Sequence, residues 1–206
     1  MKLFVEGGGD SHSLKAECRK GFTTFLTKAG ITMRPRVVAS GSRQSAYEDF
    51  CHALKQGEEA MLLVDAESAV ATKYQTGVPE IWQPWAHLRD RDRWERPSNS
   101  TDMDCHLMVQ IMESWFLADR TTLARFFGAG FAENALPAST NPIEPIDKSD
   151  VYRVLEQSTK NVQSKGKYGK AAHSFKLLCD IDPTNVIRAC PWAARFILEL
   201  KKKMGA

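Results

Sequence analysis

The sequence predicts an α/β protein with a mostly parallel, Rossmann-like sheet of about four strands flanked by helices. Short apolar runs typical of buried strands recur through the first half of the chain, and amphipathic helical patterns separate them. The length of 206 residues, with 43% hydrophobic and 26% charged residues, is typical of one compact domain.

The first third of the chain predicts the order β-α-β-α-β. The apolar runs that predict strands are Leu3 to Val5, Arg36 to Ala39 and Met61 to Val64. Apolar residues at helical spacing from Ser11 to Ala29 predict the first helix, and a pattern from Ser42 to about Lys55 predicts the second.

The rest of the chain is expected to complete the sheet and add helices. A Trp-rich insertion at about 66–103 contains prolines without a sustained period, as a long loop does. Residues 106–112 predict a fourth strand, followed by a helical stretch from Glu113 toward Phe127. We expect an α/β domain over residues 1–147 and a basic helical segment over 148–206 packed on the same domain.

The overall net charge of +3 averages two unlike parts of the chain. Residues 148–206 carry 12 Lys and Arg against 5 Asp and Glu, a net charge of +7, which leaves −4 for residues 1–147. Within the basic part, Lys165, Lys167 and Lys170 are candidate nucleic-acid ligands, because clustered cations neutralise phosphates. A solvated helix face is the alternative interpretation.

A second charged run, from Arg89 to Arg96, alternates in sign. In one interpretation it contacts a phosphate backbone while Trp94 stacks on an unpaired base. In the other it is a solvated loop whose opposite charges neutralise one another.

The five cysteines form no C-x-x-C pair, an odd count that predicts reduced thiols. No signal-peptide pattern and no apolar run approaching the ~20 residues of a membrane span is present. We therefore expect a cytoplasmic protein without a membrane segment.

Acidic residues follow two of the predicted strands. Glu6 follows the first strand, and Asp65 follows the third, with Glu67 two residues later. Ligands of parallel α/β sheets bind at the carboxyl ends of the strands, so these acids are expected to converge. Asp65 and Glu67 would point to one side of an extended chain, and their repulsion would be relieved by Mg²⁺. Two solvated acids in a strand-ending turn are the alternative.

The segment between the first strand and the first helix offers further candidates. Gly7 to Gly9 would let the backbone approach a phosphate, and Asp10 would cap the helix or add a metal ligand. Ser11 follows a Gly-Asp pair as in GDSL-type serine hydrolases, but the Asp-x-x-His that those enzymes need occurs only at Asp49 to His52, too early in the chain. The phosphate-binding P-loop motif is absent, so ATP hydrolysis would belong to a partner.

These residues carry a resemblance. E-G-G-G-D at residues 6–10 and L-L-V-D-A-E at residues 62–67 resemble the E-G-x-x-[DE] and D-x-[DE] elements of the TOPRIM fold, which topoisomerases, bacterial primases and overcoming-lysogenization-defect (OLD) nucleases share. The run M-E-S-W-F-L-A-D at residues 112–119 and the C-terminal segment resemble a TOPRIM-like bacterial family of unassigned function. Members of that family are often encoded beside ABC-type ATPases.

The resemblance implies a Mg²⁺- or Mn²⁺-dependent nuclease that cleaves DNA or RNA as effector partner of an ABC-type ATPase in anti-phage defence. Glu6 would be the general acid/base, Asp65 and Glu67 would hold the metal, and Asp10 and Glu113 would be supporting ligands. The chain has Ala69 where many TOPRIM enzymes have a third acid, which Glu113 would replace.

Alternatives remain for the activity and for the residues of the M-E-S-W-F-L-A-D run. The chain would instead be a catalytically inactive TOPRIM-like module that binds nucleic acid or an ATPase, or a hydrolase that uses Ser11. Glu113 would alternatively complement a helix dipole, and Trp115 and Phe116 would be core residues.

Overall fold

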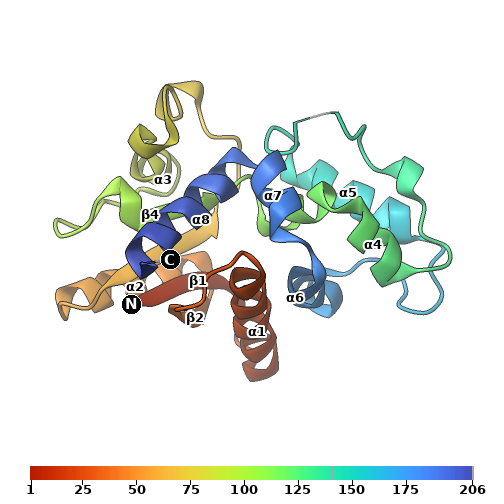
Figure 1. The fold of residues 1–206 in the computed structure, drawn as a ribbon, viewed down its shortest axis with the longest axis horizontal. Coiled ribbons are helices and arrows are strands. Elements are labelled where there is room, and N and C mark those ends of the chain that lie inside the picture. Colours follow the sequence, from red (N-terminus) through yellow and green to blue (C-terminus); the bar gives the residue numbers. More distant parts are fainter. Residues whose placement is uncertain (141, 206) are drawn as a thin grey trace.

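The central sheet has four parallel strands in the order β2-β1-β3-β4 (Figure 1). The strands are β1 (Lys2–Gly8), β2 (Arg36–Gly41), β3 (Ala60–Asp65) and β4 (Cys105–Met108). This computed structural model describes residues 1–140 and 142–205. It confirms the predicted α/β class, with helices flanking the sheet and a helical C-terminal segment.

The first two helices begin where the sequence predicts, after Ser11 and Ser42. The helices are α1 (His12–Lys28), α2 (Arg43–Lys55), α3 (Pro84–Asp92), α4 (Arg120–Phe127), α5 (Lys148–Thr159), α6 (Lys170–Asp180), α7 (Pro183–Ala189) and α8 (Pro191–Met204). Short 3-10 helices include η1 (Thr72–Tyr74), η2 (Pro79–Ile81), η3 (Asp102–Asp104), η4 (Met112–Ala118) and η5 (Glu133–Ala135). The cap of α1 is Ser11, whose Oγ accepts a hydrogen bond from the N–H of Leu14 at 3.3 Å, so the alternative role of Asp10 as N-cap is wrong.

Alternate residues of each strand face two different layers. Leu3 and Val5 of β1 pack in a core with α1 and the C-terminal helices, whereas Phe4 packs in a second core with α2 and the Trp-rich insertion. The sheet is therefore buried on both faces, as its nearly continuous apolar strands require.

Two predicted elements differ from the structure. The fourth strand ends at Met108 rather than Met112, and the stretch from Glu113 to Phe127 divides at Asp119 into η4 and α4. Asp119 caps α4 by accepting a hydrogen bond from Thr122, so the helix restarts at that residue. The side chains of η4 from Met112 to Leu117 are all buried. Because the burial is continuous rather than periodic, a helical pattern in the sequence could not predict it.

The Trp-rich insertion is ordered rather than an extended loop. Residues 89–92 of its charged run lie on α3, and Trp94 is buried with its ring stacked on Tyr47 at 4.7 Å. The indole Nε1 of Trp94 donates a hydrogen bond to Gln44 at 2.9 Å. The expectation that Trp94 stacks on a nucleic-acid base is therefore wrong, because its faces and its donor are used within the fold.

The five cysteines are free thiols, and Cys18, Cys105 and Cys190 are buried. Within residues 1–140 and 142–205, no helix has the length and apolar character needed to cross a lipid bilayer.

Candidate metal centre

Three carboxylates meet at the carboxyl edge of the sheet. Glu6 comes from β1, Asp65 ends the neighbouring strand β3, and Glu67 follows it two residues later. One oxygen atom of each lies within 4.8 Å of the others. We call these three residues the carboxylate cluster.

Backbone hydrogen bonds orient two members of the cluster. Glu6 Oε2 accepts the N–H of Asp65 at 2.9 Å, which ties the end of β1 to the end of β3. Asp65 Oδ1 accepts the N–H of Met112 at 2.7 Å, which attaches the start of η4 to the same point. The side chains of Glu6 and Asp65 are therefore held by backbone groups of their own domain.

Glu67 reaches the cluster through a turn rather than an extended chain. Its φ is +66°, in the left-handed region that a residue with a side chain rarely adopts. Its N–H donates to the carbonyl of Gln110 at 2.7 Å, which holds this conformation. We expected Asp65 and Glu67 to point to one side because the chain would be extended there. The chain is not extended at Glu67, and the turn brings the two carboxylates together instead.

Basic side chains surround the cluster. Arg43, the first residue of α2, donates from Nε to the carbonyl of Asp65 at 2.9 Å and lies 3.4 Å from Glu6 Oε2. Lys148, at the start of α5, pairs with Glu67 Oε2, and Arg91 lies 3.7 Å from the same atom. These cations compensate carboxylates that would otherwise repel one another.

Arg43 is itself firmly positioned. Its two terminal nitrogens donate to Asp92 at 2.7 and 3.0 Å, and its guanidinium lies 4.8 Å from the centre of the Trp94 ring. The insertion thus supplies the residues that aim Arg43 at the cluster.

Burial raises the pKa values of two cluster members. Burial raises the pKa of Glu6, although the hydrogen bond from Asp65 and the charge of Arg43 oppose this. Burial also raises the pKa of Asp65 well above its usual range, and the negative charges of Glu6 and Glu113 add to the effect. Three converging carboxylates offer the oxygen ligands that hard divalent cations prefer, so the donor set suits Mg²⁺ or Mn²⁺.

Glu113 lies outside the carboxylate cluster, although its charge influences Asp65. Its fully buried carboxylate accepts hydrogen bonds from Ser174 at 2.9 Å and from Tyr152 at 3.4 Å. Lys170 Nζ lies 3.8 Å from Glu113 and donates to Tyr152 at 3.1 Å. Burial lowers the pKa of Lys170, but the charges of Glu113 and Asp65 outweigh burial and raise it, so this lysine stays protonated.

The other predicted candidates lie away from the cluster. Asp10 is exposed in the turn before α1 and is not one of the three converging acids. Among the described residues, Ser11 Oγ forms a hydrogen bond with the N–H of Leu14 and with no His or acidic side chain, so the serine-hydrolase alternative lacks its base. Lys165 packs over the Phe126 ring and Lys167 pairs with Glu156 at 2.5 Å, which leaves Lys170 as the predicted lysine nearest the acids.

The sequence patterns did not single out Arg43 or Lys148. Arg43 begins the helix that follows β2, so the same strand-end rule that predicted Glu6 would have identified it. Lys148 precedes no strand and follows a long connector, and no local signal marks it.

Comparisons with known proteins identify one family. The sequence matches the family described as "Domain of unknown function (DUF4276)" over residues 5–201. The match includes Glu6, Asp65 and Glu67, so the whole carboxylate cluster lies within that domain. No curated protein and no solved structure matches the chain.

Proposed function

The chain belongs to the DUF4276 family, and from its carboxylate cluster we propose that it is a Mg²⁺-dependent nuclease of the TOPRIM type that cleaves phosphodiester bonds of DNA or RNA. The observation that carries the proposal is the convergence of Glu6, Asp65 and Glu67 within 4.8 Å. Three carboxylates at such spacing suit a hard divalent cation that also binds phosphate oxygens.

Each cluster member has a role in the proposal. Asp65, Glu67 and Glu6 would hold the cation, which supplies electrophilic activation of the phosphate when bound. Glu6 would also transfer a proton at the sugar oxygen. Asp10 and Glu113 have no ligand role in the proposal, because neither belongs to the cluster.

Lys170 is the basic residue best suited to contact the substrate phosphate. It is half-exposed, it stays protonated, and Glu113 and Tyr152 hold it beside the acids. Glu113 would thus act as a positioning residue for Lys170 rather than as a metal ligand. Lys165 and Lys167 would contact the nucleic acid farther from the reacting phosphate, if they exchange their present partners.

The wider role of the protein rests on the resemblance in the sequence. We propose a cytoplasmic effector that works with an ABC-type ATPase in anti-phage defence. Co-purification of the chain with such an ATPase encoded beside it would test this part separately.

Cleavage assays on isosteric variants test the nuclease activity. The purified protein is incubated with Mg²⁺ and labelled single- and double-stranded DNA and RNA. Glu6→Gln and Asp65→Asn keep acceptors for the N–H groups of Asp65 and Met112 but remove the negative charges. We expect each to reduce cleavage by about 100-fold or more, the contribution typical of an acid/base group.

Glu59→Gln is the matched control, because Glu59 is exposed and precedes β3 at the opposite edge of the sheet. Cleavage that survives in both cluster variants would disprove the assignment. Calorimetric Mg²⁺ binding without cleavage of any substrate would favour the alternative, a TOPRIM-like binding module that lacks activity.

A further inference from the structure

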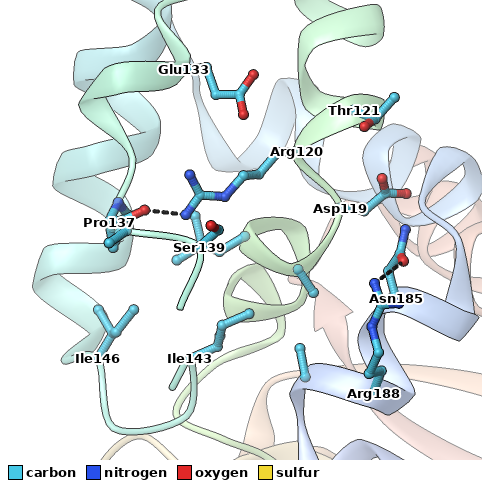
Figure 2. Close-up of a pocket in the computed structure, with 14 residues that line it drawn as sticks. Asp119, Arg120, Thr121, Glu133, Pro137, Ser139, Ile143, Ile146, Asn185 and Arg188 are labelled. Atoms are coloured by element: carbon cyan, nitrogen blue, oxygen red, sulfur yellow. Dashed lines mark hydrogen bonds between the residues drawn. The ribbon is translucent and has the colours of Figure 1, made fainter. Parts of the chain in front are cut away.

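A second polar site lies apart from the carboxylate cluster. A pocket of about 350 Å³ opens between the start of α4, the connector residues 133–139 and 142–146, and α7 (Figure 2). None of its lining residues belongs to the carboxylate cluster. Its size is within the range of pockets that enclose small organic ligands. We call it the α4–α7 pocket.

Two arginines from different helices line this pocket. Arg120 is the first residue of α4, and Arg188 comes from α7 on the other side of the pocket (Figure 2). Arg120 donates to the carbonyl of Pro137, and Arg188 donates to Asn185 Oδ1 at 2.8 Å. Among residues 1–140 and 142–205, neither guanidinium lies within 4.0 Å of a carboxylate.

Their spare hydrogen-bonding capacity favours an anion. A guanidinium has five N–H donors, and one carbonyl-type acceptor uses only a small part of them. Most charged side chains that flank the carboxylate cluster are paired with acids, so these two arginines are unlike Arg43 and Lys148. Asp119 and Glu133 also line the pocket, so the two arginines offer an anion unused N–H donors rather than an excess of positive charge.

The rest of the lining distinguishes the class of anion. A phosphate monoester has three acceptor oxygens and can accept from two arginines on opposite sides of the pocket, whereas the two oxygens of a carboxylate are satisfied by one bidentate arginine. Ile143 and Ile146 form an apolar wall that suits an organic body. Glu133 and Ser139 also line the pocket and can accept hydrogen bonds from hydroxyl or amino groups.

We propose that the α4–α7 pocket binds a small organic phosphate of the size and chemistry of a nucleoside monophosphate. Arg120 and Arg188 bind its phosphate oxygens, the isoleucines contact its ring, and Glu133 accepts hydrogen bonds from its hydroxyl groups. This site does not depend on cleavage at the carboxylate cluster.

Isothermal titration of the full chain with AMP, GMP, CMP and UMP in EDTA buffer tests the proposal. We expect at least one nucleotide to bind, and Arg188→Gln and Arg120→Gln each to weaken binding by at least tenfold. Arg188 is exposed, so its substitution leaves the fold intact even if the substitution of half-buried Arg120 does not. Arg125→Gln is the matched control, because Arg125 lies on the same helix, pairs with Thr122 and does not line the pocket.

Several results would overturn the proposal. The first is no nucleotide binding at millimolar concentration, and the second is undiminished binding in Arg188→Gln. Binding that appears only with Mg²⁺ would locate the ligand at the carboxylate cluster instead. If succinate bound as tightly as the nucleotide, the pocket would not be specific for a phosphate group. If inorganic phosphate bound as tightly, the pocket would not recognise the organic part of the ligand.

Discussion

Glu67 and Glu113 illustrate how single residues of the site depend on cations from distant segments. Glu67 pairs with Lys148, 81 residues later, and Glu113 lies 3.8 Å from Lys170. A metal ion at the carboxylate cluster would have to compete with Lys148 for the Glu67 oxygen. The Glu67 oxygen that pairs with Lys148 is thus the same atom that would bind a metal ion.

A single residue outside the site, Glu144, has a marked pH response. Its Oε1 accepts the N–H of Trp192 at 2.9 Å, at the start of α8. Burial raises the pKa of Glu144 from 4.5 to about 8, although the N–H groups of Trp192 and Ala193 favour the charged form. Between those pH values the folded state holds a proton that the unfolded chain has lost, so stability falls as pH rises.

We predict that Glu144→Gln removes this loss. The variant should be more stable than the wild type by about 1–3 kcal/mol at pH 9, a rise of a few degrees in Tm, and equal to it near pH 5. Thermal denaturation of both proteins across this pH range measures the difference. A constant difference between the two at all pH values would show that Glu144 does not titrate on folding.

At the scale of elements, the glycines that follow Glu6 let the end of β1 approach α1 closely. Gly8 has a φ of +89°, and a Cβ there would lie 2.6 Å from the backbone nitrogen of Lys15. Gly9 has a φ of +49°, with no atom within 4 Å of such a Cβ. Gly8 is therefore required by packing within the protein, whereas the space that we predicted for a phosphate exists only at Gly9.

We predict very different effects for alanine at these two positions. Gly8→Ala must displace the backbone of α1 and should lower the free energy of unfolding by about 3 kcal/mol or more. Gly9→Ala should lower it by about 1–2 kcal/mol, the cost of the left-handed conformation alone. Urea denaturation of the two variants compares them, and similar losses would mean that the loop relaxes away from Lys15.

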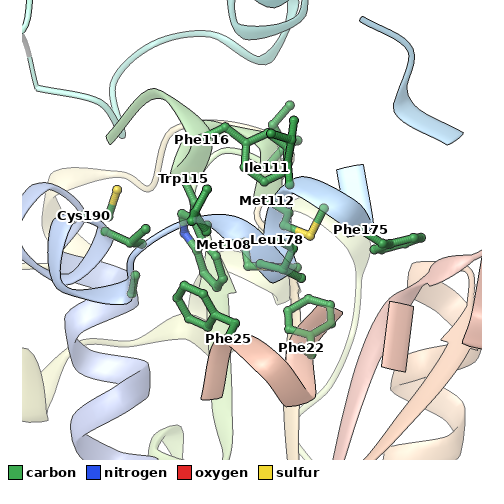
Figure 3. Close-up of a cluster of buried hydrophobic side chains, with 14 of the residues drawn as sticks. Phe22, Phe25, Met108, Ile111, Met112, Trp115, Phe116, Phe175, Leu178 and Cys190 are labelled. Atoms are coloured by element: carbon green, nitrogen blue, oxygen red, sulfur yellow. The ribbon is translucent and has the colours of Figure 1, made fainter. Parts of the chain in front are cut away.

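At the scale of the whole molecule, one core joins the two ends of the chain. Phe22 and Phe25 of α1, Trp115 of η4 and Leu178 of α6 belong to one buried cluster (Figure 3). The Trp115 ring stacks on Phe25 at 5.1 Å. The basic C-terminal segment therefore completes the core of the sheet and also supplies Lys148 and Lys170 to the acids of the preceding segment.

We predict from this shared core that residues 1–147 do not fold on their own. The fragment would expose the apolar face of α1, so it should lack a cooperative thermal transition, whereas the full chain should unfold in one step. Circular dichroism melting curves of both would show this. A sharp transition of the fragment alone would mean that the sheet is an independent unit.

Part of the site was predictable because it depends on local pattern. Glu6 and Asp65 end apolar runs, and parallel neighbouring strands place their carboxyl ends at one edge. The strand-end rule could not show that Glu113 lies outside the carboxylate cluster. Glu113 follows the fourth strand, and the direction in which η4 turns decides whether its side chain reaches the cluster. Ser174 and Tyr152, which hold Glu113, are contributed by helices distant in sequence.

The sequence by itself determined the alternation of strands and helices, the fold class and the acids at the strand ends, since hydrophobic periodicity and the succession of apolar runs along the chain are local properties. Only the tertiary structure decided the left-handed turn at Glu67, the cations around the carboxylate cluster and the α4–α7 pocket. These features depend on contacts between residues far apart in the chain, such as Lys148 with Glu67. No local spacing specifies such contacts, because they form only when the packed helices bring their side chains together.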